Sequence, residues 1–252
     1  MEKGRVLVVL PCFNEAERLP ATYFKAFLQG EENFDFLFVN DGSTDSTADI
    51  LRQICQETPN RFFFLNILTN SGKAQAVRAG ILFGQTLGNY TYSGFMDADL
   101  ATPLSELPYL LDYAEFMGGN KKFIFGSRIK ILGSQIDRNS LRHYFGRISA
   151  TGASISLQLP VYDTQCGIKL FHQSVIQSIF MDTFSSRWLF DVEIFFRFKI
   201  ALDEKTFYQN VLEVPLRVWN EIPGTKIKLS DIVKVPFELY RINQRYGRHC
   251  LF

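Results

Sequence analysis

Short apolar runs alternate with amphipathic segments through the first half of the chain. The apolar runs have the length and composition of buried strands and cover residues 5–11, 34–40, 61–68 and 91–97. Each run is followed by a segment whose apolar residues have helical spacing, at 14–30, 46–56, 72–85 and 103–117. Strands that alternate with helices in this way predict an α/β fold, in which a mostly parallel central sheet carries helices on both faces.

The second half of the chain is less regular. We expect a fifth strand at 121–128, a helix at 138–157, a loop entering a strand at 163–171, a loop entering a buried helix at 186–200 and a strand at 212–219. The segment 228–249 is amphipathic and basic, and Pro236 within it predicts a kink or a new helix start. We therefore expect one domain over 1–225, with 226–252 as a basic amphipathic helical segment of the same domain.

Length and cysteine usage restrict the class of protein. With 252 residues, of which 46% are hydrophobic, the chain is large enough to bury a full core. Its four cysteines lie far apart and form no CxxC pair, which favours reduced thiols over a disulfide framework or a zinc site. No apolar run approaches the roughly 18 residues that span a bilayer, and the N-terminal run is too short for a secretory signal. We expect a cytoplasmic protein that does not cross a membrane by itself.

Charge is distributed unevenly, although the net charge of the chain is only +1. Lys and Arg counted against Asp and Glu give −7 for residues 1–120, +6 for 121–147 and +4 for 226–252. Two basic segments therefore accompany an acidic body. Such segments are either solvated helix faces or binding surfaces for an anionic partner. The arginines that favour an anionic partner are Arg128, Arg138, Arg142 and Arg147.

Polar clusters follow the four expected strands of the first half, in the stretches PCFNE, VNDGSTD, TNSGK and MDADLATP. In a parallel sheet the carboxyl ends of the strands meet at one edge, and ligands bind there. The last cluster contains Asp97 and Asp99, two positions apart. These two residues are a general acid–base pair, a helix N-cap set or the ligands of a hard cation.

Cation binding fits the chemistry of this pair best. Residues i and i+2 of a strand point to the same side, and no His or Cys lies nearby in the sequence, so we expect an oxygen-only site for Mg²⁺ or Mn²⁺. Such a cation completes its coordination with water and with substrate phosphates. The pair therefore predicts a ligand that carries a diphosphate.

Eight motifs, in order over residues 6–226, now give a specific resemblance. They are VLVVLPCFNEAERL, VNDGSTDST, NSGKAQAVRAG, MDADLATP, FGSR, DTQCGIKLF, SRWLFDVEI and VWNEIPGTK. The set resembles family 2 glycosyltransferases of the polyprenyl-phosphate type, most strongly the dolichyl-phosphate glucosyltransferase branch and less strongly the dolichol-phosphate mannosyltransferases.

The resemblance implies a fold and an activity. The fold is GT-A, a Rossmann-like arrangement, and the reaction is an inverting transfer of a hexose from a nucleotide-diphosphate sugar to a polyprenyl phosphate. UDP-glucose is the favoured donor and GDP-mannose the second. A divalent metal, Mg²⁺ or Mn²⁺, is implied as cofactor, and a membrane surface as partner, with the enzyme peripheral on its cytoplasmic face. No nucleic acid is expected as a partner.

Roles for single residues follow from the same resemblance. The positions that match contacts to the nucleotide sugar are Pro11, Asn14, Glu15, Asp41, Gly72, Lys73 and Asp97. Asp97 and Asp99 match the metal ligands, and Arg128 matches an arginine that reaches the phosphates. The positions expected to bind acceptor phosphate or lipid are Arg128, Arg138, Arg142 and Lys226. Helix capping by Asn14 and Glu15, and a surface position for Lys73, stay open as alternatives.

One residue departs from the family pattern. The mannosyltransferases typically have a Gln two residues after the second Asp, and this chain has Ala101 there. A third metal ligand from the protein is therefore in doubt.

The catalytic set depends on the acceptor. A phosphate monoester is already ionised and nucleophilic near neutral pH, so Asp97, Asp99 and Arg128 need only align the substrates and stabilise the departing diphosphate. A saccharide hydroxyl would need a base, for which Asp191 is the candidate, with a structural role as its alternative. Two other functions stay open: a soluble family 2 transferase that acts on a saccharide hydroxyl, and a non-catalytic module that binds nucleotide sugars.

The basic segments have an expected use if the acceptor is a membrane lipid. A long prenyl chain does not leave the bilayer cheaply, so the enzyme has to come to the lipid. The segments 129–157 and 226–252 combine cations with apolar stripes, and we expect them to dock on a membrane surface. The alternative is that their apolar stripes simply pack on the sheet.

Overall fold

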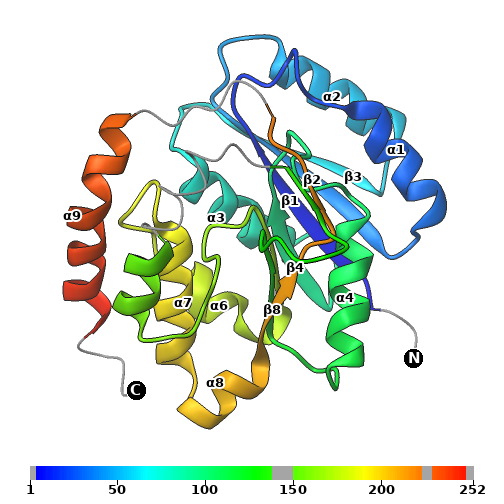
Figure 1. Ribbon diagram of the computed structural model, residues 1–252. Helices are drawn as coiled ribbons and strands as arrows, with labels where there is room; N and C mark the ends of the chain where they lie inside the picture. Colours follow the sequence, from blue (N-terminus) through cyan, green and yellow to red (C-terminus); the bar gives the residue numbers. More distant parts are fainter. Residues whose placement is uncertain (1–3, 138–149, 223–228, 248–252) are drawn as a thin grey trace.

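A seven-stranded sheet forms the centre of the computed structural model, which describes residues 4–137, 150–222 and 229–247 (Figure 1). The strand order is β3-β2-β1-β4-β7-β5-β8. The strands are β1 (Val6–Cys12), β2 (Phe34–Asp41), β3 (Phe62–Ile67), β4 (Tyr92–Met96), β5 (Phe123–Ser127), β7 (Ile168–His172) and β8 (Val211–Pro215). Neighbouring strands are parallel except where β7 pairs with β4 and β5. The predicted mostly parallel α/β sheet is confirmed.

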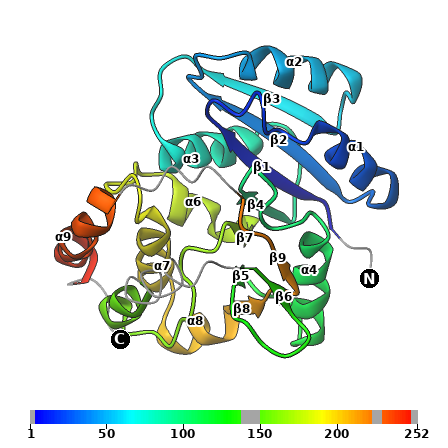
Figure 2. The ribbon, with the colours of Figure 1, turned by 45° about the horizontal axis from the view of Figure 1, so that its top comes forward.

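Helices cover both faces of this sheet. One face carries α1 (Ala21–Gly30), α2 (Thr47–Glu57) and α4 (Glu106–Phe116), and the other carries α3 (Lys73–Gly84), α6 (Ile176–Phe180) and α7 (Phe190–Ala201). Figure 2 shows α1 and α2 on one side of strands β1 to β3, with α3 on the opposite side. The short helices η1 (Gln173–Val175) and α8 (Glu204–Asn210) lie on either side of α6 and α7 in the sequence.

The apolar strands explain the two layers of core. Along β1, Leu7 and Val9 face the core beneath α3 and α7, whereas Val8 and Leu10 face the core beneath α1, α2 and α4. Helix α3 approaches the sheet closely at Gly80, where an added Cβ would lie 2.4 Å from a methyl carbon of Val9. Because the sheet is buried on both faces, polar groups can gather only where its strands end.

The C-terminal part of the chain adds a small sheet and a long helix. Strand β6 (Gln135–Ile136) pairs with β9 (Val218–Trp219) in a two-stranded sheet. Helix α9 (Leu229–Tyr246) lies beside α7, at the left of Figures 1 and 2, and buries Ile242 and Tyr246. Within the residues described, the structure contains no helix with the length and apolar character needed to cross a membrane.

Two expectations from the pattern, for the first helix and for the strand at 212–219, differ in detail from the structure. The helix expected at 14–30 begins only at Ala21, because Pro20 restricts the residue before it and the chain makes turns up to that point. The strand expected at 212–219 is divided between β8 and β9. Helix α9 continues through Pro236, which is exposed. Of the helix expected at 138–157, residues 150–157 are helical and 138–149 lie outside the described residues.

The cysteines agree with the expectation of reduced thiols. Cys12, Cys55 and Cys166 are thiols rather than members of a disulfide, and Cys12 is fully buried at the end of β1. Burial raises the pKa of the Cys55 thiol to about 12. The fourth cysteine, Cys250, lies outside the described residues.

Candidate active site

The carboxyl ends of β1, β2, β4 and β5 bring polar residues to one edge of the sheet. Asp41 is the last residue of β2, Asp97 follows β4 directly, and Arg128 follows β5. Because β7 is antiparallel, its beginning meets the same edge, and the Asp97 N–H donates to the carbonyl of Gly167 at 3.1 Å. The predicted convergence at this edge is therefore present.

Asp41 holds the turn that leads into α3. Its buried carboxylate accepts hydrogen bonds from the N–H and hydroxyl of Ser71 and the N–H of Gly72, each at 2.8 Å, and from the side chain of Asn70 at 3.2 Å. Gly72 has φ +87°, a conformation that favours glycine. This turn sets Lys73 as the first residue of α3.

Asn14 and Glu15 connect the end of β1 to the loop before α2. The Asn14 side-chain oxygen accepts from the N–H of Thr44 at 2.9 Å, and the Glu15 N–H donates to the hydroxyl of Thr47 at 2.8 Å. The Glu15 carboxylate also pairs with Arg18 at 2.8 Å. Asn14 therefore bonds to the loop before α2 and Glu15 to a side-chain hydroxyl, so neither of these two bonds caps a helix. Binding of the nucleotide by these residues and by Pro11 stays a prediction.

Lys73 and Asp97 form an ion pair next to the chain of β7. The Lys73 Nζ lies 2.5 Å from one carboxylate oxygen of Asp97. Burial opposes the charge of this lysine, but the carboxylates of Asp97 and Asp191 outweigh burial and raise the pKa of Lys73. A Cβ at position 167 would lie 2.1 Å from the other Asp97 oxygen, so Gly167 is what allows this carboxylate its place.

Asp99 lies close to Asp97 and in an unfavourable environment for a second negative charge. One of its oxygens accepts from the N–H of Ala101 at 3.1 Å. Burial, together with the charge of Asp97, raises the pKa of Asp99. A cation bound between the two carboxylates would relieve this repulsion. The donor set is oxygen-only, so the pair fits Mg²⁺ or Mn²⁺.

Ala101, which takes the place of the glutamine discussed above, makes a backbone contact with the C-terminal part of the chain. The Ala101 carbonyl accepts from the N–H of Asn220 at 2.8 Å, which ties the Asp pair to the segment after β9. Among the described residues, no group of three or more His, Cys, Asp and Glu side chains is arranged to hold a metal. A cation at Asp97 and Asp99 would therefore take its remaining ligands from water and substrate.

Arg128 is engaged with a carboxylate of its own chain. Its guanidinium donates to both oxygens of Asp163, at 2.7 and 2.8 Å, and its backbone N–H donates to the same carboxylate at 3.1 Å. Burial opposes the charge, but Asp163 outweighs it and raises the pKa of Arg128. The guanidinium carbon also lies 5.6 Å from the ring centre of Trp219. The guanidinium that we expected to reach a phosphate makes a bidentate contact with Asp163 here.

The sequence analysis missed Lys169, which is fully buried in β7. Its Nζ lies 2.7 Å from a carboxylate oxygen of Asp191 and donates to the carbonyl of Cys166 at 2.7 Å. The Phe95 ring lies between this pair and the Lys73–Asp97 pair. The Nζ atoms of Lys169 and Lys73 are 5.4 and 5.9 Å from the centre of the ring. A lysine within the apolar run GIKLF was the available signal.

A second missed residue is Arg187, in the loop before α7. Its side chain is exposed, donates to the side-chain oxygen of Asn70 at 3.1 Å and lies against Gly72. It therefore adds a cation beside the turn that Asp41 holds. The residues expected to meet the acceptor, Arg138, Arg142 and Lys226, lie outside the described residues.

Comparison with known proteins agrees with this arrangement. The model of glycosyl transferase family 2 matches residues 7–180, more than half of the chain. The dolichyl-phosphate beta-glucosyltransferase ALG5D of Trichomonas vaginalis is 33% identical over 254 residues, which cover 96% of this chain and 74% of that protein. The dolichyl-phosphate beta-glucosyltransferase of Saccharomyces cerevisiae is 30% identical over 258 residues, covering 95% and 74%.

A solved structure has the same fold. The crystal structure of glucosyl-3-phosphoglycerate synthase from Mycobacterium tuberculosis, in complex with Mn²⁺, UDP and glucosyl-3-phosphoglycerate, aligns with a TM-score of 0.66 and 14% sequence identity. The alignment covers 98% of this chain and 80% of the other. At this identity the likeness establishes the architecture alone.

Proposed function

The chain belongs to glycosyltransferase family 2, and from this we propose that it transfers a hexose from a nucleotide-diphosphate sugar to a polyprenyl phosphate. The observation that carries the proposal is the identity of about a third to dolichyl-phosphate beta-glucosyltransferases over nearly the whole chain. The site geometry supports it, because Lys73 stands beside the carboxylates of Asp97 and Asp99, and Arg187 lies at the neighbouring turn before α3. Such an edge suits a diphosphate.

The reaction needs alignment and charge compensation from this chain. An oxygen of the acceptor phosphate attacks C1 of the sugar from the side opposite the diphosphate, the new C1–O bond forms, and the bond to the diphosphate breaks with its electron pair leaving on the diphosphate. A single displacement of this kind inverts the configuration at C1. Lys73 and Arg187 stabilise the departing charge, and the protein needs no strong base because the acceptor is already ionised.

Asp97 and Asp99 are the residues that would hold a divalent cation, Mn²⁺ or Mg²⁺. When bound there, the cation would neutralise charge on the diphosphate. The support is the oxygen-only donor set, the raised pKa of Asp99 and the Mn²⁺ named for the M. tuberculosis enzyme of the same fold. UDP-glucose is the proposed donor, because the relatives are named glucosyltransferases and the solved neighbour was crystallised with UDP. GDP-mannose is the second choice.

The state of Asp191 favours a phosphate acceptor over a saccharide hydroxyl. A general base has to take a proton from the acceptor, yet the Asp191 carboxylate is buried and ion-paired with the fully buried Lys169. A carboxylate held in this way suits a structural role better than proton abstraction. We therefore place transfer to a saccharide hydroxyl second and a non-catalytic binding module third.

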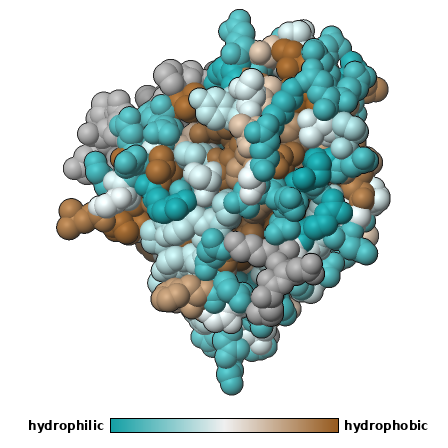
Figure 3. Space-filling view, turned by 90° about the vertical axis from the view of Figure 1, so that its right-hand side faces the viewer, coloured by the Kyte–Doolittle hydropathy of each residue, from teal (hydrophilic) through white to brown (hydrophobic). Residues whose placement is uncertain are grey.

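We propose peripheral binding to the cytoplasmic face of a membrane, where the lipid acceptor would be met. Helix α9 carries two exposed aromatic residues, Phe237 and Tyr240, close to the exposed cations Lys234, Arg241 and Arg245. The side of the molecule opposite α9, drawn in Figure 3, shows hydrophobic residues scattered among hydrophilic ones. The α9 side therefore suits an anionic lipid surface better than this one.

A direct assay tests the proposed reaction. The purified chain is incubated with Mn²⁺ and radiolabelled UDP-glucose or GDP-mannose, with either dolichyl phosphate or a panel of free saccharides as acceptor. We expect label from UDP-glucose in the organic-extractable lipid only when dolichyl phosphate is present. Label in saccharide alone would support the hydroxyl transferase, and no turnover with any pair would contradict an enzymatic role.

A further inference from the structure

Side chains hold the loop between α6 and α7 at several of its backbone groups. The carboxylate of Glu193, on α7, accepts from the N–H of Ser185 at 3.1 Å and of Ser186 at 2.6 Å. The Phe184 carbonyl accepts from Gln75 of α3 at 2.9 Å. Loops of this kind are ordinarily exposed and variable in conformation, so anchoring by buried side chains at both ends of the loop calls for a physical reason.

Arg197 holds the other end of this loop. One turn after Glu193 on α7, its guanidinium donates to the carbonyls of Ile179, Asp182 and Thr183, at 2.7 to 2.8 Å, and stacks 4.3 Å from the ring centre of Phe184. Glu193 and Arg197 are both buried. A buried charged pair contributes little net stability, because desolvation offsets its attraction. We therefore expect the hydrogen bonds of Glu193 and Arg197 to fix the conformation of the loop rather than to add stability.

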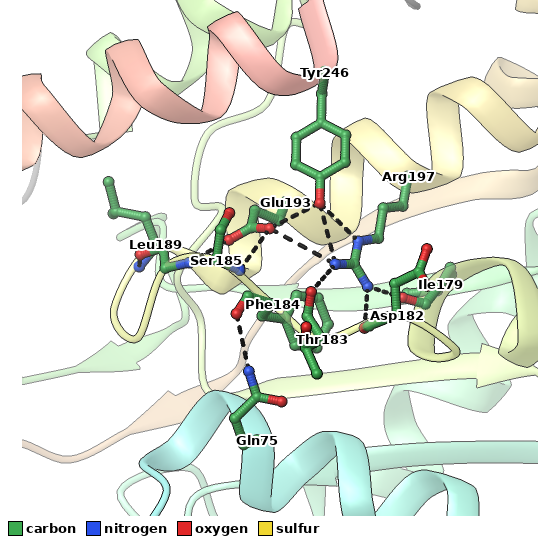
Figure 4. Close-up of polar contacts among 11 residues, drawn as sticks. Gln75, Ile179, Asp182, Thr183, Phe184, Ser185, Leu189, Glu193, Arg197 and Tyr246 are labelled. Atoms are coloured by element: carbon green, nitrogen blue, oxygen red, sulfur yellow. Dashed lines mark hydrogen bonds and ion pairs between the residues drawn. The ribbon is translucent and has the colours of Figure 1, made fainter.

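Helix α9 completes the network from outside, as Figure 4 shows. The Tyr246 hydroxyl donates to Glu193 at 3.0 Å and accepts from Arg197 at 3.1 Å, while its ring stacks on Phe196 with the centroids 6.0 Å apart. Burial raises the pKa of Tyr246, which keeps the phenol protonated as a donor. The carboxylate that anchors the loop is thus itself oriented by α9.

A second contact joins α9 to the same loop. The Ser186 hydroxyl donates to Glu238 of α9 at 2.5 Å and accepts from the N–H groups of Trp188 and Leu189, at 3.2 and 2.7 Å. Ser186 therefore fixes the backbone on both sides of Arg187. The side chain of Arg187 points away from this network, to Asn70 and Gly72 at the start of α3.

We propose that Tyr246 is a positioning residue for the donor: through Glu193 and the loop 183–189 it holds Arg187 beside the start of α3, where the guanidinium binds the diphosphate of the nucleotide sugar. This inference rests on the proposed function. It assigns Arg187 as a donor-binding residue and makes donor affinity depend on how α9 is seated. Since α9 is also the helix proposed to meet the membrane, docking and donor binding share one structural element.

Binding of UDP in the presence of Mn²⁺, followed by titration calorimetry, tests the inference without the lipid. Tyr246→Phe removes the hydroxyl and keeps the ring on Phe196, and Arg187→Ala removes the proposed contact. We expect the dissociation constant for UDP to rise about tenfold in Arg187→Ala, since a charge-assisted bond is lost, and severalfold in Tyr246→Phe. Tyr23→Phe, which alters an exposed tyrosine on α1, should bind UDP like the wild type.

The double variant separates positioning from simple destabilisation. If Tyr246 acts through Arg187, the double variant binds UDP no more weakly than Arg187→Ala alone. Additive losses, or unchanged affinity in Tyr246→Phe, would overturn the inference. Should Tyr246→Phe fail to fold, Ser186→Ala carries the same comparison through the second contact. A wild type that binds neither UDP nor GDP would instead refute the proposed function, and with it this inference.

Discussion

At the scale of single residues, the Asp97–Asp99 pair shows how a costly arrangement indicates function. Two carboxylates at one strand end repel each other, and burial disfavours the charged form of Asp99 further. Both effects raise the pKa of Asp99. Lys73 compensates Asp97 through a direct ion pair, whereas Asp99 accepts a hydrogen bond from the neutral N–H of Ala101. A bound divalent ion would turn this unfavourable environment into a site.

Asp99→Ala tests the pair as metal ligands. We expect turnover to fall by about 100-fold or more, because the diphosphate loses its compensating charge. The fold should stay intact, since the hydrogen bond that Asp99 accepts is a local one, from the N–H of Ala101. Asp49→Ala, at an exposed position on α2, is the matched control. Turnover of Asp99→Ala close to that of the wild type, or full wild-type activity in excess EDTA, would refute the metal assignment.

Arg128→Lys tests the bidentate contact with Asp163. Lysine keeps the charge but cannot donate to both carboxylate oxygens in a fixed plane, so the segment after β5 loses its anchor. We expect turnover to fall at least tenfold, which corresponds to a rise of about 1.4 kcal/mol in the activation free energy. Arg52→Lys, at an exposed arginine with one bond to Asp49, should change nothing. Equal kinetics for the two variants would show that the paired bonds of Arg128 to Asp163 are not needed for turnover.

Lys169→Met tests the buried pair beneath the site. Removal of the lysine leaves the Asp191 carboxylate buried without its partner, which should lower the free energy of unfolding by about 3–5 kcal/mol. Adding Asp191→Asn to Lys169→Met should restore part of that loss, because the uncompensated charge is gone. Urea unfolding of the single and double variants measures both steps. A loss below about 1 kcal/mol in the single variant would show that the pair is not what keeps Asp191 in place.

At the scale of elements, the apolar runs predicted β1 to β5 and the helices between them, because strands buried on both faces have near-continuous apolar sequences. The metal-binding pair could also be predicted from the sequence, since Asp97 and Asp99 lie in one short stretch. The contacts of Lys169 and Arg187 were not predictable, because their partners, Asp191 and Asn70, come from other elements and only the tertiary fold brings them together. The same holds for Tyr246, which meets Glu193 across two helices.

Helix boundaries and buried charges show where the pattern fails within an element. The early start expected for α1 overlooked Pro20, which ends the preceding turn. The apolar run of α7 was correctly interpreted as buried, yet it contains Asp191, Glu193 and Arg197, all buried. Their cost is met by loop carbonyls, loop N–H groups and Lys169, none of which is visible in the periodicity of the helix.

At the scale of the whole molecule, the question is how an enzyme of this fold would reach a lipid. Each buried CH₂ of a prenyl chain contributes about 0.8 kcal/mol to membrane partitioning, so a long chain stays in the bilayer. Helix α9 is anchored to the body through Tyr246 and Glu238, and its exposed side carries Phe237 and Tyr240 with cations near them. An attached helix with such a side suits an interface.

Sedimentation with liposomes tests this docking. We expect the purified chain to sediment with vesicles that contain anionic lipid and less with neutral vesicles. Binding should weaken as salt rises but not vanish, because salt screens the cations and leaves insertion of apolar side chains unaffected. The double variant Phe237→Ser with Tyr240→Ser should lose the salt-resistant part, whereas Tyr23→Ser, at an exposed tyrosine on α1, should not.

The salt dependence decides which part of α9 acts. If binding to anionic vesicles disappears entirely in high salt for the wild type, the cations alone hold the protein and the aromatic residues do not insert. If no protein sediments even at low salt, autonomous docking is refuted and a membrane partner has to recruit the chain. Retention of a salt-resistant fraction that depends on Phe237 and Tyr240 would place α9 in the interface. The loop that presents Arg187 would then be fastened to a membrane-bound helix through Ser186 and Glu193.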